Sequence, residues 1–133
     1  MKTAFVSASY ADRVALAPAL DAIKAALNAA GFRPHVFIER YAFAPEDARR
    51  MMATALRDLR AADLLVAEVS HKAIGVGIEV GAAAAWNIPI VAVRRAGAEP
   101  STTVGGLAAA SIVYRAPDDL RAALGAALAA LSL

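Results

Sequence analysis

The chain has 133 residues, none of them cysteine and only two of them histidine, His35 and His71. Without cysteine there can be neither a disulfide framework nor a thiolate metal site, and two histidines so far apart are too few for a zinc site. We therefore expect no metal and no cofactor. A reducing compartment suits this composition, and we expect the protein to be cytoplasmic.

Net charge and long apolar runs are also scarce. Fourteen Lys and Arg against twelve Asp and Glu leave a formal charge of +2, too small an excess for a surface that follows a nucleic-acid backbone. No uncharged run reaches the roughly 18 residues that cross a bilayer, and the apolar run at the N-terminus is shorter than a signal-peptide core. We expect a soluble protein with no nucleic-acid and no membrane partner.

Apolar residues are abundant, at 59%, and they fall into alternating strand and helix patterns. The expected strands are Thr3–Ser7, Pro34–Ile38, Leu64–Val69, Ile88–Val93 and Ser111–Tyr114. Unbroken apolar strands that alternate with helices predict a parallel sheet covered on both faces. We expect one α/β domain over residues 1–133, a five-stranded doubly wound parallel sheet of the flavodoxin or Rossmann-like type.

The helices between these strands are predicted from the spacing of apolar residues and from proline. Leucine and isoleucine recur at helical spacing over residues 16–27, but Pro18 suits a first helical turn better than an interior. The sequence therefore predicts a separate turn at residues 13–17. A short helix is expected over Gly77–Trp86, after the third strand.

In doubly wound sheets the ligand crevice lies beyond the carboxyl ends of the strands. Glu79 falls there, two residues after Gly77. In the first turn of a helix, free backbone N–H groups and the helix dipole would keep its carboxylate ionised at neutral pH. Such a carboxylate can attack an electrophilic carbon, or it can do no more than stabilise its helix.

The loops at the same edge supply further candidates for substrate binding. They are Ser7, Ser9, Tyr10, Glu68, His71, Gly75, Gly77 and Ser101. Hydroxyl groups after the first strand and around residues 101–103 can hold a phosphate or serve as ordinary turn and cap residues, while the glycines allow close approach of a ligand. Glu68, inside an apolar strand, is either a structural hydrogen-bonding group or a site residue.

Three segments resemble the nucleoside 2-deoxyribosyltransferase family, and most closely its 2'-deoxynucleoside 5'-phosphate N-hydrolase branch. They are Ala-Asp-Leu-Leu-Val-Ala-Glu-Val-Ser at 62–70, Gly-Val-Gly-Ile-Glu-Val-Gly at 75–81 and Asn-Ile-Pro-Ile-Val-Ala-Val at 87–93. The resemblance implies a nucleoside or nucleotide substrate whose anomeric carbon is attacked by Glu79. It also implies that Ser9 and Ser101 hold sugar or phosphate, and that the protein is a homodimer or higher homo-oligomer.

The chain departs from that family in three places. Phe5 stands where a tyrosine is common, and residues 8–13 replace a glycine-rich loop. The aspartate that helps the base leave aligns with Ala55, and general acid help is typically worth about 10²- to 10⁴-fold. Asp58, one helical turn further on, is a candidate substitute, as are Glu68 and His71.

Three functional hypotheses follow from these residues. The leading one is an N-glycosidase or deoxyribosyltransferase, with hydrolysis favoured over transfer because two serine loops fit a phosphate. The second is a nucleotide-binding or signalling module with little or no turnover, which the absent acid at Ala55 supports. The third is NAD cleavage, because residues 5–12 are similar to the opening of TIR-like domains, whose glutamate removes nicotinamide from NAD.

Overall fold

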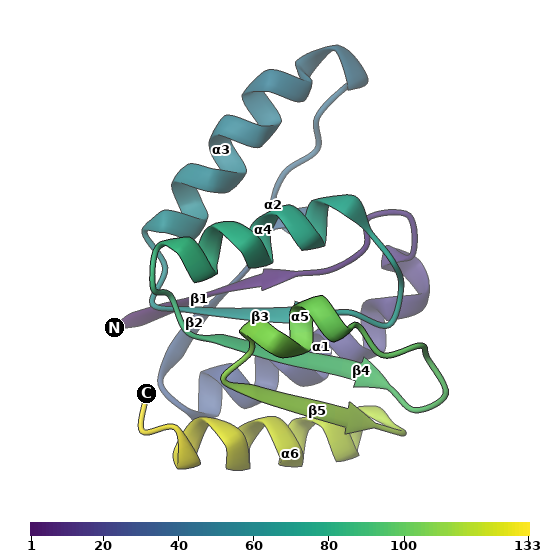
Figure 1. Cartoon of the computed structure of the whole chain (residues 1–133), viewed down its shortest axis with the longest axis vertical. Helices are drawn as coiled ribbons and strands as arrows, with labels where there is room; N and C mark the ends of the chain where they lie inside the picture. Colours follow the sequence, from purple (N-terminus) through teal and green to yellow (C-terminus); the bar gives the residue numbers. More distant parts are fainter.

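A computed structural model describes residues 1–133, and Figure 1 shows a parallel sheet between two layers of helices. The strands are β1 (Lys2–Ser7), β2 (Phe32–Val36), β3 (Leu64–Glu68), β4 (Ile90–Arg95) and β5 (Ala110–Tyr114). Their order is β2-β1-β3-β4-β5, with every neighbouring pair parallel. This confirms the predicted five-stranded doubly wound sheet, in the order of the flavodoxin type.

The helices divide between the two faces of the sheet. They are α1 (Arg13–Ala29), α2 (Phe37–Arg40), α3 (Ala48–Arg60), α4 (Ile74–Ala85), α5 (Thr102–Leu107) and α6 (Pro117–Ala130), with a 3₁₀ turn η1 (Pro45–Asp47) before α3. α1 and α6 pack together on one face, while α3, α4 and α5 lie on the other, where α3 projects beyond the sheet (Figure 1). None of the helices combines the length and the apolar character that crossing a membrane requires.

Two hydrophobic clusters hold these layers to the sheet, because side chains alternate along each strand. In β3, Leu64 and Val66 belong to the cluster under α1 and α6, whereas Leu65 and Ala67 belong to the cluster under α3 and α4. The same alternation decides to which side the polar residues at the strand ends point. It therefore sorts the candidate site residues between the two faces.

The start of α1 differs from the prediction. The helix begins at Arg13, and Pro18 lies inside it, exposed to solvent. The first helical hydrogen bond, from the Leu16 N–H to the Asp12 carbonyl, is already in place before the proline. The prediction of a separate turn at residues 13–17 is therefore wrong, and the buried apolar face of α1 offsets the bond that proline cannot donate.

Other helices and strands begin or end a few residues away from their predicted bounds. β2 ends at Val36 because the chain turns into α2 at Phe37, and β4 begins at Ile90, two residues later than predicted. α5 occupies part of a segment that had been predicted as a loop. α4 begins at Ile74 instead of Gly77, and this shift matters for Glu79.

Candidate active site

Glu79 is anchored to the end of β1 by Ser7. Ser7 alternates with Val6, so its side chain points to the face covered by α3 and α4, where it is 2% exposed. Its Oγ donates a hydrogen bond to Oε1 of Glu79 at 2.5 Å. This contact joins the first strand to α4 across a separation of 72 residues.

Glu79 is the sixth residue of α4, not a first-turn residue as the sequence indicated. The free N–H groups of the helix start are therefore out of its reach. Burial raises the pKa of Glu79 to about 7, against the opposing effect of the Ser7 hydrogen bond. The expectation that the helix start keeps this carboxylate ionised at neutral pH is therefore wrong, because the loss of water on burial outweighs the hydrogen bond from Ser7.

Glu79 lines a cavity of about 440 Å³ at the carboxyl end of β1. The loop after β1 contributes Ser9, Tyr10 and Asp12 to the lining, and the loop before α4 contributes Lys72. The volume lies in the range typical of small-molecule sites. The cavity is large enough for a small organic ligand beside Glu79.

Three aromatic rings form one wall of this cavity. Phe37 from α2 lies 5.0 Å from Tyr41 and 6.2 Å from Phe43 between ring centroids, and Tyr41 lies 5.7 Å from Phe43. Planar bases stack on such faces, with a typical contribution of about 1–3 kcal/mol per base. These rings were not among the predicted site residues, because their clustering depends on the path of the chain through α2.

The loop that contains Ser101, Thr102 and Thr103 lines a different cavity from that of Glu79. Ser101 and the two threonines after it line a hollow of about 490 Å³, and Lys72, Ala73 and Val76 border both cavities. The Ser101 Oγ accepts a hydrogen bond from the Val104 N–H at 3.2 Å and so caps α5. Within one chain, Ser101 therefore does not join Glu79 in a common cavity.

The predicted site residues divide accordingly. Ser9, Tyr10 and Gly75 line the cavity of Glu79, whereas His71, Gly77 and Ser101 line the second cavity. Ser7 lies behind the first cavity, in contact with Glu79. The crevice predicted at the strand ends is thus two adjoining hollows.

Glu68 lies on the other face of the sheet. It alternates with Ala67, so its side chain points toward α1 and α6, and it is 1% exposed. Its carboxylate accepts hydrogen bonds from the N–H of Ser70 at 2.7 Å, from the Ser70 hydroxyl at 2.9 Å and from the Tyr114 hydroxyl. Glu68 lines neither cavity, and its three hydrogen bonds are those expected of the structural alternative.

Asp58 also lies outside the cavity of Glu79. Its carboxylate accepts hydrogen bonds from Arg57, from the Tyr41 hydroxyl at 3.1 Å and from His35 Nε2 at 3.0 Å. Burial by itself would raise the pKa of Asp58. The hydrogen bonds from Arg57, Tyr41 and His35 together have the larger effect, so the pKa of Asp58 lies below its ordinary value. Asp58 lines neither cavity and its carboxylate is taken up by these three donors, so the geometry disfavours it as the substitute acid. It holds Tyr41 in the aromatic wall instead.

One carboxylate of the cavity was not among the predicted site residues. Asp12 lines the cavity together with Ala55 and Glu79. Its Oδ2 accepts a hydrogen bond from the Ser9 Oγ at 2.6 Å, and its Oδ1 lies 3.6 Å from Nε2 of His71. In the sequence Asp12 looks like any aspartate that precedes a helix, so no local signal distinguishes it.

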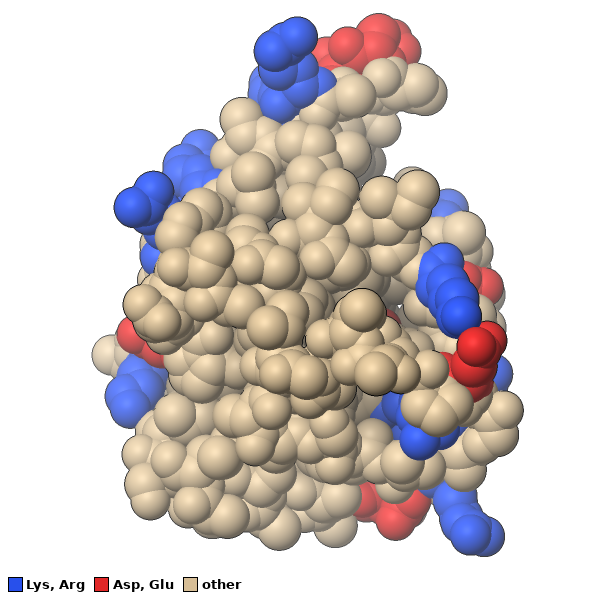
Figure 2. Space-filling model, in the orientation of Figure 1, with Lys and Arg blue, Asp and Glu red and all other residues tan.

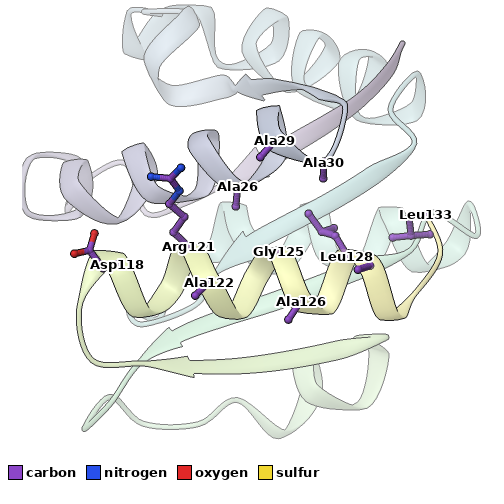
Figure 3. Close-up of a pocket in the computed structure, with 11 residues that line it drawn as sticks. Ala26, Ala29, Ala30, Asp118, Arg121, Ala122, Gly125, Ala126, Leu128 and Leu133 are labelled. Carbon is purple, nitrogen blue, oxygen red and sulfur yellow. The ribbon is translucent and has the colours of Figure 1, made fainter.

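A third hollow, of about 730 Å³, lies on the outside of the molecule between α1 and α6 (Figure 3). Its lining is mainly alanine, with Gly125 and Leu128, and small side chains leave space between the two helices. α1 and α6 cover the face of the sheet opposite α4. The sheet therefore separates this hollow from Glu79.

Comparison with known proteins gives a family match over most of the chain. A family model described as nucleoside 2-deoxyribosyltransferase matches residues 10–113. A protein of Syntrophotalea carbinolica with the provisional name 2'-deoxynucleoside 5'-phosphate N-hydrolase 1 is 61% identical over 41 residues. That segment is 31% of this chain and 29% of the relative, so the match spans less than a third of the relative's length.

Several solved structures share the fold. A CMP N-glycosidase of Clostridium botulinum has a TM-score of 0.69 at 16% identity, covering 96% of this chain and 100% of its own. A 2-deoxyribosyltransferase of Bacillus psychrosaccharolyticus has a TM-score of 0.69 at 14% identity, with coverages of 92% and 95%. A conserved protein of Enterococcus faecalis has a TM-score of 0.71 at 21% identity, with coverages of 96% and 99%.

Proposed function

This chain belongs to the nucleoside 2-deoxyribosyltransferase family, and from that membership we propose that it cleaves the N-glycosidic bond of a nucleoside or nucleoside 5'-monophosphate with Glu79 as nucleophile. The observation that carries the proposal is the position of Glu79. Its carboxyl is held by Ser7 on the lining of a cavity whose volume and aromatic wall suit a nucleoside. A carboxyl with a pKa near 7 is also a common feature of catalytic sites.

The proposed reaction has two steps. The carboxylate of Glu79 attacks the anomeric carbon, the bond to the base breaks, and its electron pair leaves with the base. The resulting glycosyl ester is then attacked by water, which gives hydrolysis, or by a second base, which gives transfer. The base would stack on the wall formed by Phe37, Tyr41 and Phe43.

We favour water over a second base as the acceptor. Two of the similar proteins are named as an N-glycosidase and an N-hydrolase, and a third as a deoxyribosyltransferase. Lys72 borders both cavities, and its ammonium, paired with exposed Glu99 at 3.0 Å, can exchange that partner for a 5'-phosphate. Asp12, on the lining of the cavity that holds Glu79, is partly exposed to solvent.

Release of free base from a panel of nucleosides and nucleoside 5'-monophosphates tests the proposal. We expect Glu79→Ala to lower the rate on every cleaved substrate by about 10³-fold or more. Glu46→Ala, which removes an exposed carboxylate of η1, is the matched control and should leave the rate unchanged. Mass spectrometry with a 2-fluoro-2-deoxy substrate analogue should find the sugar on the peptide that contains Glu79. Activity that survives Glu79→Ala would contradict the mechanism.

A second candidate function is a nucleotide-binding module with little turnover. Ala55 favours it, because this residue lines the cavity at the position where the resemblance expects a proton-donating aspartate. Adding NAD to the same panel and measuring nicotinamide release tests the third hypothesis. Thermal stabilisation by a nucleotide, with no release of base or nicotinamide, would favour the binding module.

We also propose that the chain forms a homo-oligomer through the face that carries α4 and α5. Figure 2 shows that Lys, Arg, Asp and Glu lie mainly around the margin of this face, leaving its centre almost uncharged. Ile74 and Ile78 on α4 are 86% and 45% exposed, and Leu107 on α5 is 49% exposed. A second copy on this surface would lie beside the cavity that contains Ser101.

A further inference from the structure

The departing base needs a proton, and the cavity offers one carboxyl group besides Glu79 that can supply it. Asp12 and Glu79 are the two carboxylates in the lining. We propose that Asp12 is the general acid and base of this site, in place of the aspartate that Ala55 replaces. The inference rests on the proposed function and names the residue that completes it.

The position of Asp12 argues against a purely structural role. It immediately precedes α1, where an aspartate usually accepts a hydrogen bond from a backbone N–H of the first turn. The Asp12 side chain makes no such bond. Its Oδ2 faces the Ser9 hydroxyl and its Oδ1 faces the His71 imidazole, so the carboxyl is turned from the helix toward the cavity.

Glu79 and Asp12 each accept a hydrogen bond from a serine near the end of β1. Ser7 at the end of β1 donates to Glu79, and Ser9, two residues further on, donates to Asp12. Both serines are buried, whereas the Asp12 side chain is partly exposed to solvent. One short segment of chain thus positions a nucleophile and a second carboxyl in the same cavity. Glycosidases that form a covalent intermediate need this pair of groups.

His71 is a positioning residue for Asp12 in this arrangement. Its Nε2 lies 3.6 Å from Asp12 Oδ1, and its Nδ1 is buried without a hydrogen-bond partner. His71 lines the second cavity, not the cavity of Glu79. It therefore acts on the substrate only through Asp12, by setting the orientation and the charge environment of that carboxyl.

The proton balance closes with water as the only other reactant. As Glu79 attacks the anomeric carbon, protonated Asp12 gives its proton to the departing base, and the base leaves with the bond electrons. A water molecule then attacks the glycosyl ester and gives a proton to the Asp12 carboxylate. The sugar leaves with the hydroxyl of that water, Glu79 is released as a carboxylate, and Asp12 regains its proton.

Two substrates with different leaving groups test the assignment. One is the natural nucleotide found in the panel, and the other is the same sugar carrying p-nitrophenolate, which leaves without a proton. We expect Asp12→Asn to lower kcat on the nucleotide by about 10²- to 10⁴-fold but on the p-nitrophenyl substrate by less than about tenfold. Glu79→Ala should abolish activity on both substrates.

Controls separate this role from folding and from substrate binding. Asparagine can still accept the Ser9 hydrogen bond, so Asp12→Asn should keep the wild-type melting temperature. Asp21→Asn, an exposed carboxylate on α1, should affect neither substrate. His71→Ala should lower kcat on the nucleotide only, and the double variant with Asp12→Asn should lose no more than Asp12→Asn alone.

The outcomes are distinguishable. Equal losses on both substrates in Asp12→Asn, or a change in KM alone, would overturn the role of Asp12 and leave Glu79 as nucleophile. Full activity of Asp12→Asn on the nucleotide would overturn it as well. If the wild type cleaves neither substrate, the proposed function fails, and the role of Asp12 falls with it.

Discussion

The carboxyl group of Glu79 titrates close to neutral pH because its surroundings act in opposite directions. Burial raises its pKa, and the hydrogen bond from Ser7 limits the rise, leaving a pKa of about 7. Other titratable side chains line the same cavity. They are Tyr10, Asp12, Tyr41 and Lys72. A nucleophile must be ionised, so the rate should depend on this balance.

On the p-nitrophenyl substrate, which needs no proton from Asp12, we expect kcat/KM to rise with pH up to about 7, roughly tenfold per pH unit on the acidic side. Ser7→Ala removes the hydrogen bond that lowers the pKa of Glu79. The rising part of the pH–rate profile should therefore shift to higher pH by about one unit. The pH–rate profiles of both proteins measure this shift. Ser101→Ala, a serine of the second cavity, is the control. If the rising part of the pH–rate profile of Ser7→Ala stayed at the same pH or moved to lower pH, Ser7 would not lower the pKa of Glu79.

The same raised pKa makes Glu79 a source of pH-dependent instability. Between about 4.5, its ordinary value, and about 7, the folded protein holds a proton that the unfolded chain releases. The contribution of this group to stability therefore falls as pH rises through that window and is constant above it. Glutamine carries no ionisable proton and should be free of this loss.

Glu79→Gln should accordingly be more stable than the wild type near pH 8, by up to about 3 kcal/mol, and equal to it near pH 4. Urea unfolding at both pH values measures the difference. Glu46→Gln, at an exposed position, should follow the wild type at both. An unchanged gap between Glu79→Gln and the wild type across this range would show that the carboxyl is not desolvated.

At the scale of elements, one hydrogen bond connects two strands that are not neighbours. The carboxylate of Glu68 at the end of β3 accepts from the Tyr114 hydroxyl at the end of β5, across the intervening β4. Ser70 completes the group by donating to Glu68 and accepting from the Arg95 N–H. Burial, and the hydrogen bond to Glu68, raise the pKa of Tyr114, so the hydroxyl remains a donor.

Tyr114→Phe should lower the free energy of unfolding by about 1–3 kcal/mol, because the buried Glu68 loses a donor. The melting temperature should fall by several degrees, whereas base release should stay within about twofold, since this group lies on the face of the sheet opposite Glu79. Tyr10→Phe, with an exposed ring, should leave the melting temperature unchanged. No loss of stability in Tyr114→Phe would mean that water replaces the missing donor.

At the scale of the whole molecule, the uncharged face over α4 and α5 predicts self-association. Light scattering should give a mass of at least twice 13.7 kDa for the wild type. Changing Ile74 and Ile78 together to glutamate should produce a monomer, because a charge buried in an apolar interface is costly. Val14→Glu, 83% exposed on α1, is the matched control and should leave the oligomer intact. A wild type that is monomeric at all concentrations would contradict this prediction.

Helices and strands could be predicted from the sequence where neighbouring residues alone indicate them. Alternating apolar strands and helices predicted the parallel sheet, because this pattern needs only neighbouring residues. The start of α4 was missed because Ala73 caps it without a side-chain hydrogen bond. Nothing in the sequence there resembles a cap, and the error placed Glu79 in the wrong helical turn.

The sequence by itself determined the fold class, the family and the candidate nucleophile, because hydrophobic periodicity and a short motif are properties of neighbouring residues. Only the tertiary structure decided which polar groups share a cavity. It placed Asp12 in the cavity of Glu79, turned Glu68 to the opposite face, tied Asp58 to His35 and Tyr41 and placed Ser101 in an adjoining hollow. Such pairings, and the pKa that burial produces, depend on how distant segments pack, which no local pattern encodes.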